Sequence, residues 1–345
     1  MKILAIDTSC DETAAAVTEG KEILSNIVWS QASLHAKFGG VMPSLAQRKH
    51  EERIDFVLDK SLKTAGTKIE TVDAIAVTIG PGLSIALGVG VNKAKELATK
   101  YKKPLIPMNH VESHILSPLA HSNQKIELPA FGLALSGKNT LFVLIEEIGK
   151  YKVLAETHDD ALGEALDKSA RLLGFGYPGA HLLEKFAKDG DSNKYTLPIP
   201  LISDKIKDRF SYSGLKTAFV RLFNSIKKPK KQEICDLAAV FQETAFEHII
   251  KVLNYQISEV KVQHPQIKDL LFGGGVANNT LIRSKLRSLA KKHSLNLHIP
   301  YTKKILSDNA AMIGVCAYLK NKDQDLQKYL NFTNIDRDPK LKLAH

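Results

Sequence analysis

Two stretches of this chain resemble each other, and this internal repeat constrains the fold more than any other feature. Residues 7–17 (DTSCDETAAAV) align with residues 134–144 (ALSGKNTLFVL), which matches Ser9 with Ser136 and Thr13 with Thr140. Further along, the apolar run LLFGGGVANN at 270–279 parallels AVTIGPGLS at 76–84. Self-similarity of this kind indicates that one structural unit has been duplicated.

Each half is expected to begin with a meander of strands and to continue in strand–helix units. In the first half, apolar runs predict strands at 2–7, 13–18, 22–28, 74–80 and 104–107. Helical periodicity predicts helices at 44–66, 85–100 and 110–116. The predicted fold class is α/β, with two lobes and a cleft between them. We expect an N-terminal lobe over residues 1–129 and a C-terminal lobe over 130–345 with a helical insertion at about 160–265.

The composition favours a cytoplasmic protein with a polyanionic partner. The 345 residues include 48 Lys and Arg against 37 Asp and Glu, and the net charge of +11 would attract nucleic acid. A basic surface that serves solubility explains the charge equally well. Cys10, Cys235 and Cys316 form no Cys-x-x-Cys pair, which fits a reducing compartment rather than a zinc ribbon or a disulfide framework. The sequence has neither a signal-peptide pattern nor an apolar run long enough to cross a bilayer.

A pair of histidines makes the strongest candidate site. His110 and His114 are four residues apart, so a helix that begins near His110 places both on one face and turns Glu112 away. Asp308 follows the corresponding strand of the second half, and we expect it to face the pair across the cleft. Two imidazoles and a carboxylate suit a catalytic divalent metal with open positions. The alternative is that both histidines only cap the helix and pack. The spacing differs from the His-Glu-x-x-His of metalloproteases, which weakens a peptidase interpretation.

Glycine-rich turns form a second candidate site. They are GPGL at 80–83, SGK at 136–138, YPGA at 177–180 and GGGVANN at 273–279. Glycine lets backbone approach a phosphate closely, and a helix N-terminus favours an anion. None of these turns matches a P-loop or the dinucleotide fingerprint, and any one of them is explained as an ordinary strand-to-helix turn. Two at equivalent points of a duplicated fold favour a nucleotide held between the lobes.

Taken together, these motifs resemble one family along almost the whole chain. The matching segments are IDTSCDET, SQASLHAKFGGVMPSLAQRKH, GPGLSIALGVG, NHVESHIL, DDALGEALDKSARLLGFGYPGA, FSYSGLKTA, FGGGVANN and SDNAAMIG. Their order is similar to that of the universal tRNA N6-adenosine threonylcarbamoyltransferase family, once called O-sialoglycoprotein endopeptidase. The resemblance implies a duplicated fold of the actin, sugar kinase and Hsp70 type (ASKHA) with a central nucleotide cleft.

The activity implied by the resemblance is a transfer to tRNA. A threonylcarbamoyl group passes from threonylcarbamoyl-AMP to N6 of adenosine 37, next to the anticodon, in tRNAs that read codons beginning with A, and AMP is released. The implied partners are tRNA, a smaller inactive TsaB-like paralogue on the first lobe, a TsaE-like ATPase, and a TsaC/Sua-type enzyme that supplies the adenylate; no membrane is implied. Basic groups that could contact tRNA are Lys100, Lys102, Lys103, the segment 227–231, Arg283, Lys285, Arg287, Lys291 and Lys292.

The resemblance also implies roles for individual residues. The metal ligands would be His110, His114 and Asp308, for one divalent ion, with Fe²⁺ favoured and Zn²⁺ as the alternative. The nucleotide, threonylcarbamoyl-AMP or ATP, ADP or AMP, would contact Ala134, Leu135, Ser136, Gly137, Lys138, Asp167, Ala180, Glu184, Gly274, Gly275 and Asn279. Asp167 is expected on the ribose. Asp11 and Glu12 are candidates for orienting the attacking amine or moving its proton, unless they only cap the turn.

Three positions depart from the family pattern. Lys138 and Ala180 stand where the family usually has glycine, and Ser44 follows Pro43 where the family has glutamate. Lys138 is therefore either strained, if its backbone needs a positive φ, or able to reach a phosphate with its ammonium group. Two other functions remain open at this point: a noncatalytic scaffold paralogue, which would lack the His pair and the Asp, and a metallopeptidase.

Overall fold

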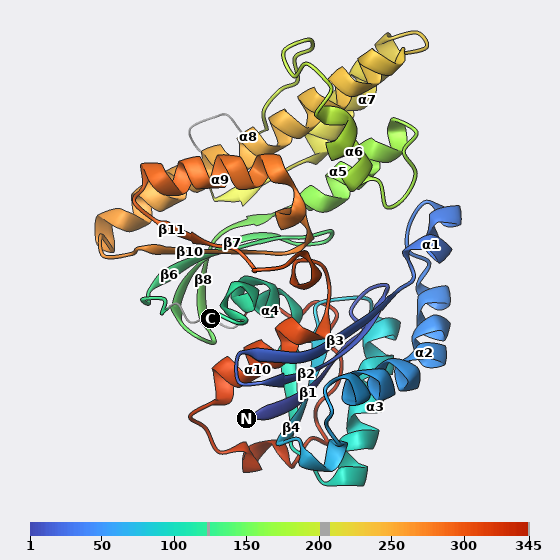
Figure 1. Ribbon diagram of the computed structural model, residues 1–345. Coiled ribbons are helices and arrows are strands. Elements are labelled where there is room, and N and C mark those ends of the chain that lie inside the picture. Colours follow the sequence, from blue (N-terminus) through green and yellow to red (C-terminus); the bar gives the residue numbers. More distant parts are fainter. Residues whose placement is uncertain (123–124, 201–207, 344–345) are drawn as a thin grey trace. The chain divides into compact units, whose positions relative to one another are not determined.

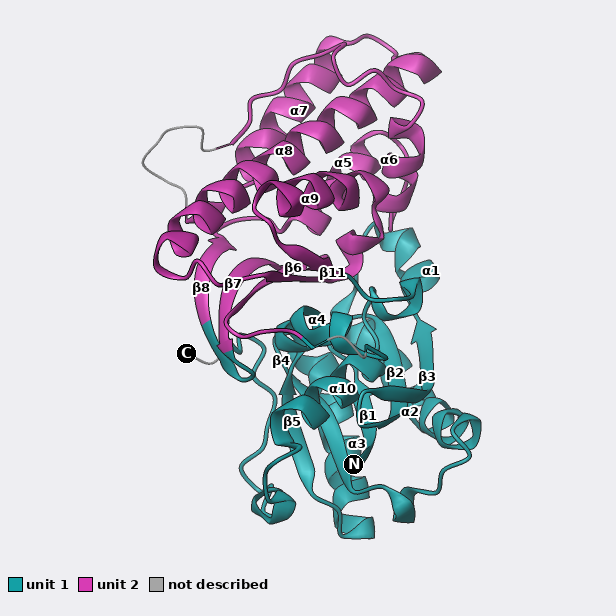
Figure 2. Cartoon of the chain, turned by 60° about the vertical axis from the view of Figure 1, so that its left-hand side comes forward, with its two compact units in different colours: residues 1–125, 147–151, 299–345 teal, residues 126–146, 152–298 magenta. Residues whose placement is uncertain are grey.

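A computed structural model describes residues 1–122, 125–200 and 208–343 of the chain (Figure 1). These residues form two compact units. Unit 1 contains residues 1–125, 147–151 and 299–345, and unit 2 contains residues 126–146 and 152–298 (Figure 2). The two units differ in their bounds from the predicted lobes 1–129 and 130–345, because the last part of the chain returns to unit 1. The predicted bounds describe where each copy of the repeat begins and ends in the sequence, and they stay a prediction. No helix among the described residues has both the length and the apolar character to cross a membrane.

Unit 1 is built on a five-stranded sheet. Its strands are β1 (Lys2–Asp7), β2 (Glu12–Glu19), β3 (Glu22–Ser30), β4 (Ala74–Gly80) and β5 (Leu105–Asn109). The order is β3-β2-β1-β4-β5, with β1 antiparallel to β2 and parallel to β4. Residues 3–6 of β1 are fully buried, as expected for a continuous apolar run covered on both faces.

Helices cover both faces of this sheet. The helices of unit 1 include α1 (Ala32–His35), α2 (Pro43–Thr64), α3 (Ser84–Tyr101), α4 (His110–Leu116) and α10 (Ala310–Asn321). Leu4 and Ile6 of β1 share a core cluster with Ile54 of α2 and Val91 of α3. The intervening Ala5 points to the other face, where a Cβ at Gly314 of α10 would lie 3.3 Å from it. Since α4 packs on α10, the helix with the histidine pair and the segment that precedes α10 lie on the same side of the sheet.

Unit 2 repeats the same topology. Its sheet has β6 (Ala130–Leu135), β7 (Thr140–Glu147), β8 (Lys150–Thr157), β9 (Arg209–Phe210), β10 (Asp269–Gly273) and β11 (Asn296–His298), in the order β11-β10-β6-β7-β8-β9. Apart from the two-residue β9, this is the order of the first sheet, with β6 and β7 in the places of β1 and β2. The antiparallel and parallel pairings of β6 also match those of β1. The predicted α/β duplication is confirmed.

The remaining helices lie on one side of the second sheet (Figure 2). They are α5 (Leu162–Leu172), α6 (Ala180–Ala187), α7 (Ser213–Ser225), α8 (Lys231–Gln263) and α9 (Thr280–Lys292). Of these, α5 to α8 fall between β8 and β10 in the sequence, where the helical insertion is predicted. The strands and helices predicted for the first half agree with the structure to within two residues at each end.

A glycine turn after β10 depends on the absence of a side chain. Gly274 has φ of +96°, and a Cβ there would lie 2.4 Å from the carbonyl oxygen of Leu135 at the end of β6. A Cβ at the neighbouring Gly275 would meet nothing within 4 Å. The close approach of this turn to β6 therefore requires glycine at position 274 and tolerates a larger residue at 275.

The difference in space and backbone conformation between Gly274 and Gly275 can be tested with a matched pair of alanine variants. Gly274→Ala should lower the free energy of unfolding by about 1–3 kcal/mol, because alanine is strained at positive φ and its methyl group meets backbone. Gly275→Ala should change it by no more than about 0.5 kcal/mol. Urea denaturation of both variants measures the difference. Equal losses at the two positions would show that the backbone at Gly274 does not set the packing of this turn.

Candidate functional site

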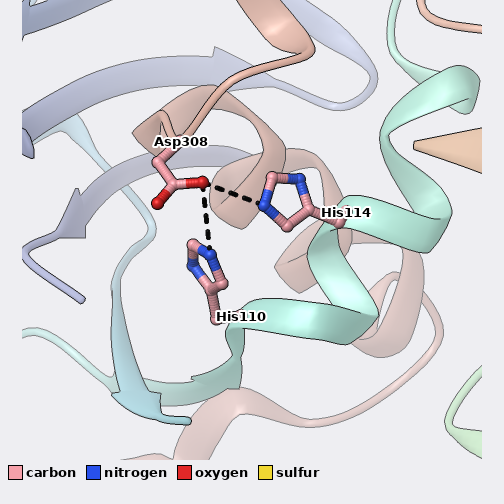
Figure 3. A group of neighbouring side chains, drawn as sticks. All are labelled: His110, His114 and Asp308. Carbon is pink, nitrogen blue, oxygen red and sulfur yellow. Dashed lines mark hydrogen bonds and ion pairs between the residues drawn. The ribbon is translucent and has the colours of Figure 1, made fainter. Parts of the chain in front are cut away.

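The histidine pair lies on α4, whose start is fixed by a side-chain cap. Asn109 Oδ1 accepts hydrogen bonds from the backbone N–H groups of Val111 and Glu112. Since Ser, Thr, Asp and Asn are the favoured residues at this position, Asn109 sets the first helical residue at His110. His110 and His114 are then one turn apart and lie on one face of the helix (Figure 3).

Asp308 is positioned in the same way by its neighbour in sequence. Asn309 is fully buried, and its Oδ1 accepts from Met312 N at the start of α10. Its Nδ2 donates to the carbonyl oxygens of Ile305 and Ser307. Asn309 thereby ties the loop that carries Asp308 to the helix that follows.

The three candidate ligands converge at one point. Asp308 Oδ1 lies 3.0 Å from His114 Nε2 and 3.5 Å from His110 Nε2 (Figure 3). One ligand atom from each residue lies within 4.8 Å of the others. All three residues belong to unit 1, so the expectation that Asp308 comes from the opposite lobe is wrong. Asp308 follows the last strand of the second half in sequence, but α10 packs on the first sheet and carries it there.

Two residues behind His110 orient its ring. His110 Nδ1 lies 3.1 Å from Ser9 Oγ and 3.3 Å from Asp7 Oδ2, and both groups are buried. With Nδ1 held on that side, Nε2 faces Asp308, an arrangement common to metal-binding histidines. Sequence reasoning missed these contacts. The available signal was that Asp7 and Ser9 end the first strand, at the start of the aligned turn.

The carboxylates also set the protonation of the cluster. Burial opposes a charged imidazole, but Asp308 and Asp7 outweigh it and raise the pKa of His110 to about 10. Burial lowers the pKa of His114. Burial would raise the pKa of Asp308, yet His110 and His114 hold it well below its ordinary value. The ionised carboxylate and two imidazoles form a donor set that fits a divalent transition metal, which would take the place of the His110 proton.

Asp11 and Glu12 lie in the turn between β1 and β2. His50 fixes both sides of this turn, since its Nε2 lies 3.1 Å from Cys10 O and its Nδ1 lies 2.8 Å from Thr13 Oγ1. Burial, followed by the charges of Asp11 and Asp308, raises the pKa of Glu12 well above its ordinary value. Glu12 therefore lies within electrostatic reach of the cluster of His110, His114 and Asp308, and it holds a proton more tightly than an ordinary glutamate.

The predicted nucleotide-binding residues come together in unit 2. β6 and β10 are parallel neighbours, with Ala134 paired to Gly273, so the turns that follow the two strands are adjacent. Ligands of open α/β sheets bind at such carboxyl ends. Ala134, Leu135 and Ser136 are buried, whereas Gly137 and Lys138 are exposed.

Three of these residues are engaged in holding helix starts. Asp167 Oδ1 accepts from the N–H groups of Gly179 and Ala180, both at 2.8 Å. Glu184 Oε1 accepts from Thr280 N and Oγ1. Asn279 caps α9 with its Oδ1 and donates from Nδ2 to Gln242 at 2.7 Å. These hydrogen bonds hold the first residues of α6 and α9 in place. The expected contact of Asp167 with a ribose stays a prediction.

Lys138 is not strained. The described non-glycine residues with positive φ are Lys102, His121, Lys228 and Ser294. Of the two alternatives for Lys138, backbone strain is therefore excluded, because the turn between Ser136 and Asn139 closes without a left-handed residue at that position. Ser136 N donates to Asn139 O, and Asn139 N donates to Ser136 Oγ.

Several of the candidate basic residues are already engaged. Lys285 forms an ion pair with Glu243, Lys103 donates to the carbonyl oxygen of Glu70, and Lys292 donates to Asn254. Arg287 and Lys291 are exposed on α9. Lys285, paired with a carboxylate, is therefore less available to a polyanion than the exposed basic residues of unit 2.

Solved structures share this fold. HypF in its phosphate- and nucleotide-bound form aligns with 93% of this chain and 46% of its own, with a TM-score of 0.58 and 14% identity. The chain therefore has the predicted α/β fold of two similar halves, and within unit 1 His110, His114 and Asp308 form a group that could hold a metal ion.

Sequence comparison then identifies the family. The sequence model of "TsaD: tRNA N6-adenosine threonylcarbamoyltransferase" matches residues 22–315. Proteins of that name from Caldicellulosiruptor saccharolyticus and Geotalea uraniireducens are 40% and 43% identical to this chain. Each alignment covers 93% of this chain, and 93% and 92% of the respective relatives. The chain belongs to the tRNA N6-adenosine threonylcarbamoyltransferase family.

The geometry of His110, His114 and Asp308 predicts that the protein binds a metal ion and that both histidines are needed to hold it. Purified protein loaded with Fe²⁺ or Zn²⁺ should retain about one ion per chain after desalting, because a site with three protein ligands binds such ions tightly. His114→Ala should retain less than about a tenth of that amount. His181→Ala, which removes an exposed histidine on α6, should behave as the unsubstituted protein. Elemental analysis measures all three, and full retention by His114→Ala would exclude this cluster as the site.

Proposed function

We propose that this chain transfers the threonylcarbamoyl group of threonylcarbamoyl-AMP to N6 of adenosine 37 in tRNAs that read codons beginning with A. The observation that carries the proposal is the family match over residues 22–315 together with the convergence of His110, His114 and Asp308. The same three residues argue against a noncatalytic scaffold, because such a paralogue would lack them.

We infer that the adenylate binds at the turns of unit 2. The exposed backbone at Gly137 and Lys138 and the turn at Gly274 and Gly275 follow the adjacent strands β6 and β10, where a phosphate can meet backbone N–H groups. The side chains of Asp167 and Glu184 are consistent with this proposal, since their hydrogen bonds fix the starts of α6 and α9.

The proposed reaction starts from an activated acyl donor. The N6 amine attacks the carbamoyl carbon, the bond from that carbon to the phosphate oxygen breaks, AMP leaves, and the amine loses one proton. The protein must therefore align the amine with the carbonyl and stabilise the charge that grows on oxygen. The chemistry contains no peptide hydrolysis, and the spacing of the histidines gives a metallopeptidase no support.

His110, His114 and Asp308 would hold the metal, for which we favour Fe²⁺ with Zn²⁺ as the alternative. Imidazole nitrogens and a carboxylate suit both ions. Bound there, the ion would supply a Lewis acid for a carbonyl or phosphate oxygen of the substrate. Asp7 and Ser9 would keep the His110 ring in place while it binds.

We propose Glu12, supported by Asp11, as the group that accepts the amine proton. A raised pKa suits this role, because a carboxylate that binds protons more tightly is a stronger base. Glu12 Oε1 accepts from Ser30 Oγ at 3.2 Å, which orients the carboxyl group.

We propose that the protein and its partners work in the cytoplasm. A TsaC/Sua-type enzyme would supply the adenylate, a TsaE-like ATPase would assist turnover, and exposed Arg287 and Lys291 would contribute to tRNA binding. We propose that a smaller TsaB-like paralogue docks on unit 1 near Phe56 and Ile85, which are exposed apolar side chains of α2 and α3.

Reconstitution tests the function. The protein, its partners, threonine, bicarbonate, ATP, the adenylate-forming enzyme and unmodified tRNA should yield threonylcarbamoyladenosine, detected by mass spectrometry. His110→Ala should abolish the product, and Glu12→Gln should slow its formation by about 10²-fold or more. His181→Ala serves as the control. The proposal fails if the unsubstituted protein gives no more product than His110→Ala, and a peptidase function would replace it if glycoprotein cleavage instead depends on His110.

Lys138 allows a test of the adenylate site. Its exposed ammonium should strengthen phosphate binding, so Lys138→Gly should weaken AMP binding by about twofold to fivefold, as expected for one exposed charge pair. Binding of adenosine, which lacks the phosphate, should not change. Lys194→Gly, at an exposed lysine in another turn of unit 2, is the matched control. Calorimetry measures these affinities, and unchanged AMP binding in Lys138→Gly would remove Lys138 from the proposed site.

A further inference from the structure

Glu112 lies between the two histidines in sequence, yet the proposed metal centre does not use it. Residues two apart on a helix point in nearly opposite directions, so Glu112 faces away from His110 and His114. Its side chain is buried, with only 3% of it exposed. A buried carboxylate is costly unless other groups satisfy it, so its partners indicate its role.

Two partners hold this carboxylate. Lys320 Nζ, near the end of α10, lies 2.7 Å from Glu112 Oε2. The hydroxyl of Tyr151, at the start of β8, donates to Glu112 Oε1 at 2.8 Å. We refer to Glu112, Lys320 and Tyr151 as the Glu112 clasp. All three residues belong to unit 1.

The clasp is a charged pair with a neutral phenol. Burial alone would lower the pKa of Lys320, but Glu112 outweighs it and raises that pKa, so the ammonium is retained. Burial and the charge of Glu112 both raise the pKa of Tyr151, which keeps its hydroxyl a donor. A buried ion pair adds little net stability, because removing its charges from water offsets their attraction. A pair of this kind can instead fix one defined arrangement of the two helices that it joins.

That arrangement bears directly on the metal ligands. The clasp joins α4, which carries both histidines, to α10, which follows directly from Asp308. Metal–ligand distances must be correct to within about 0.2 Å, whereas a shift of one residue along a helix moves its atoms by about 1.5 Å. A small slip of α10 along α4 would therefore separate Asp308 from the two imidazoles.

We propose that Glu112 is a positioning residue for the metal centre, and that through Lys320 and Tyr151 it holds α4 and α10 at the separation at which His110, His114 and Asp308 meet. This inference rests on the proposed metal site. It assigns to Glu112 no contact with substrate or metal.

Cobalt binding by the full-length protein tests the proposal. The affinity for Co²⁺ and the visible absorption of the Co²⁺ complex are measured for Glu112→Gln and Lys320→Met. Both variants should bind Co²⁺ at least about tenfold more weakly, in the range found when groups that orient metal ligands are removed, and with altered absorption. The double variant should be little weaker than either single variant, because both changes break the same contact. Lys320→Arg, which keeps the charge, should restore binding to within about threefold of the unsubstituted protein.

Lys285→Met is the matched control. It breaks the ion pair between Lys285 of α9 and Glu243 of α8, which joins two helices of unit 2, whereas the cluster belongs to unit 1. It should lower the melting temperature without changing Co²⁺ affinity. If Glu112→Gln does not fold, Lys320→Met and Tyr151→Phe each remove a single partner and carry the same expectation.

The outcomes separate this inference from the proposed metal site. If the unsubstituted protein binds no Co²⁺, the metal site itself is wrong. If it binds Co²⁺ and the clasp variants bind as tightly, while melting at a lower temperature as Lys285→Met does, the clasp only stabilises the fold and the positioning role is overturned.

Discussion

The packing of α10 on the first sheet is the contact on which the proposed centre depends. The histidines belong to the first half of the chain and Asp308 to the end of the second, so only this return of the chain brings them together. The fit requires small residues: a Cβ at Gly314 would lie 2.6 Å from Thr18 Oγ1. Close approach of α10 to β1 and β2 places Asp308 next to α4, and the Glu112 clasp fixes the opposite side of the same helix pair.

Several carboxylates interact with one another and with His110 around this contact. Asp7 and Asp308 both act on His110, and Asp11 and Asp308 act on Glu12. Without a cation, a proton on His110 offsets part of this negative charge. A divalent ion bound by the same residues would offset more of it, so the electrostatics that raise the pKa of His110 also favour metal binding. The same region would thus bind a cation and leave a proton acceptor nearby.

The duplicated fold and the histidine pair could be predicted from the sequence. The repeat between residues 7–17 and 134–144 predicted two sheets of the same topology, because a duplicated strand meander has few other solutions. The spacing of His110 and His114 predicted a shared helical face, since that depends only on helical geometry. The histidine spacing is a local feature of the sequence, and the sheet topology follows from a repeated segment, so neither requires knowledge of tertiary contacts.

Other features depended on tertiary contacts that no periodicity encodes. An apolar helix such as α10 can cover either sheet, so its return to unit 1 and the position of Asp308 were not foreseen. Asp7 and Ser9 became recognisable only once His110 lay against them. Whether Lys138 is strained could not be decided from sequence, because φ is set by how the turn closes. The partners of Glu112 come from segments nearly 40 and more than 200 residues away.

Anomalous X-ray scattering from crystals of the metal-loaded protein tests the central claim most directly. We expect one anomalous peak about 2.0–2.2 Å from His110 Nε2, His114 Nε2 and a carboxylate oxygen of Asp308, with Glu112 still bound to Lys320. A peak at another group of residues, or a metal held by the histidines with Asp308 turned away, would contradict it.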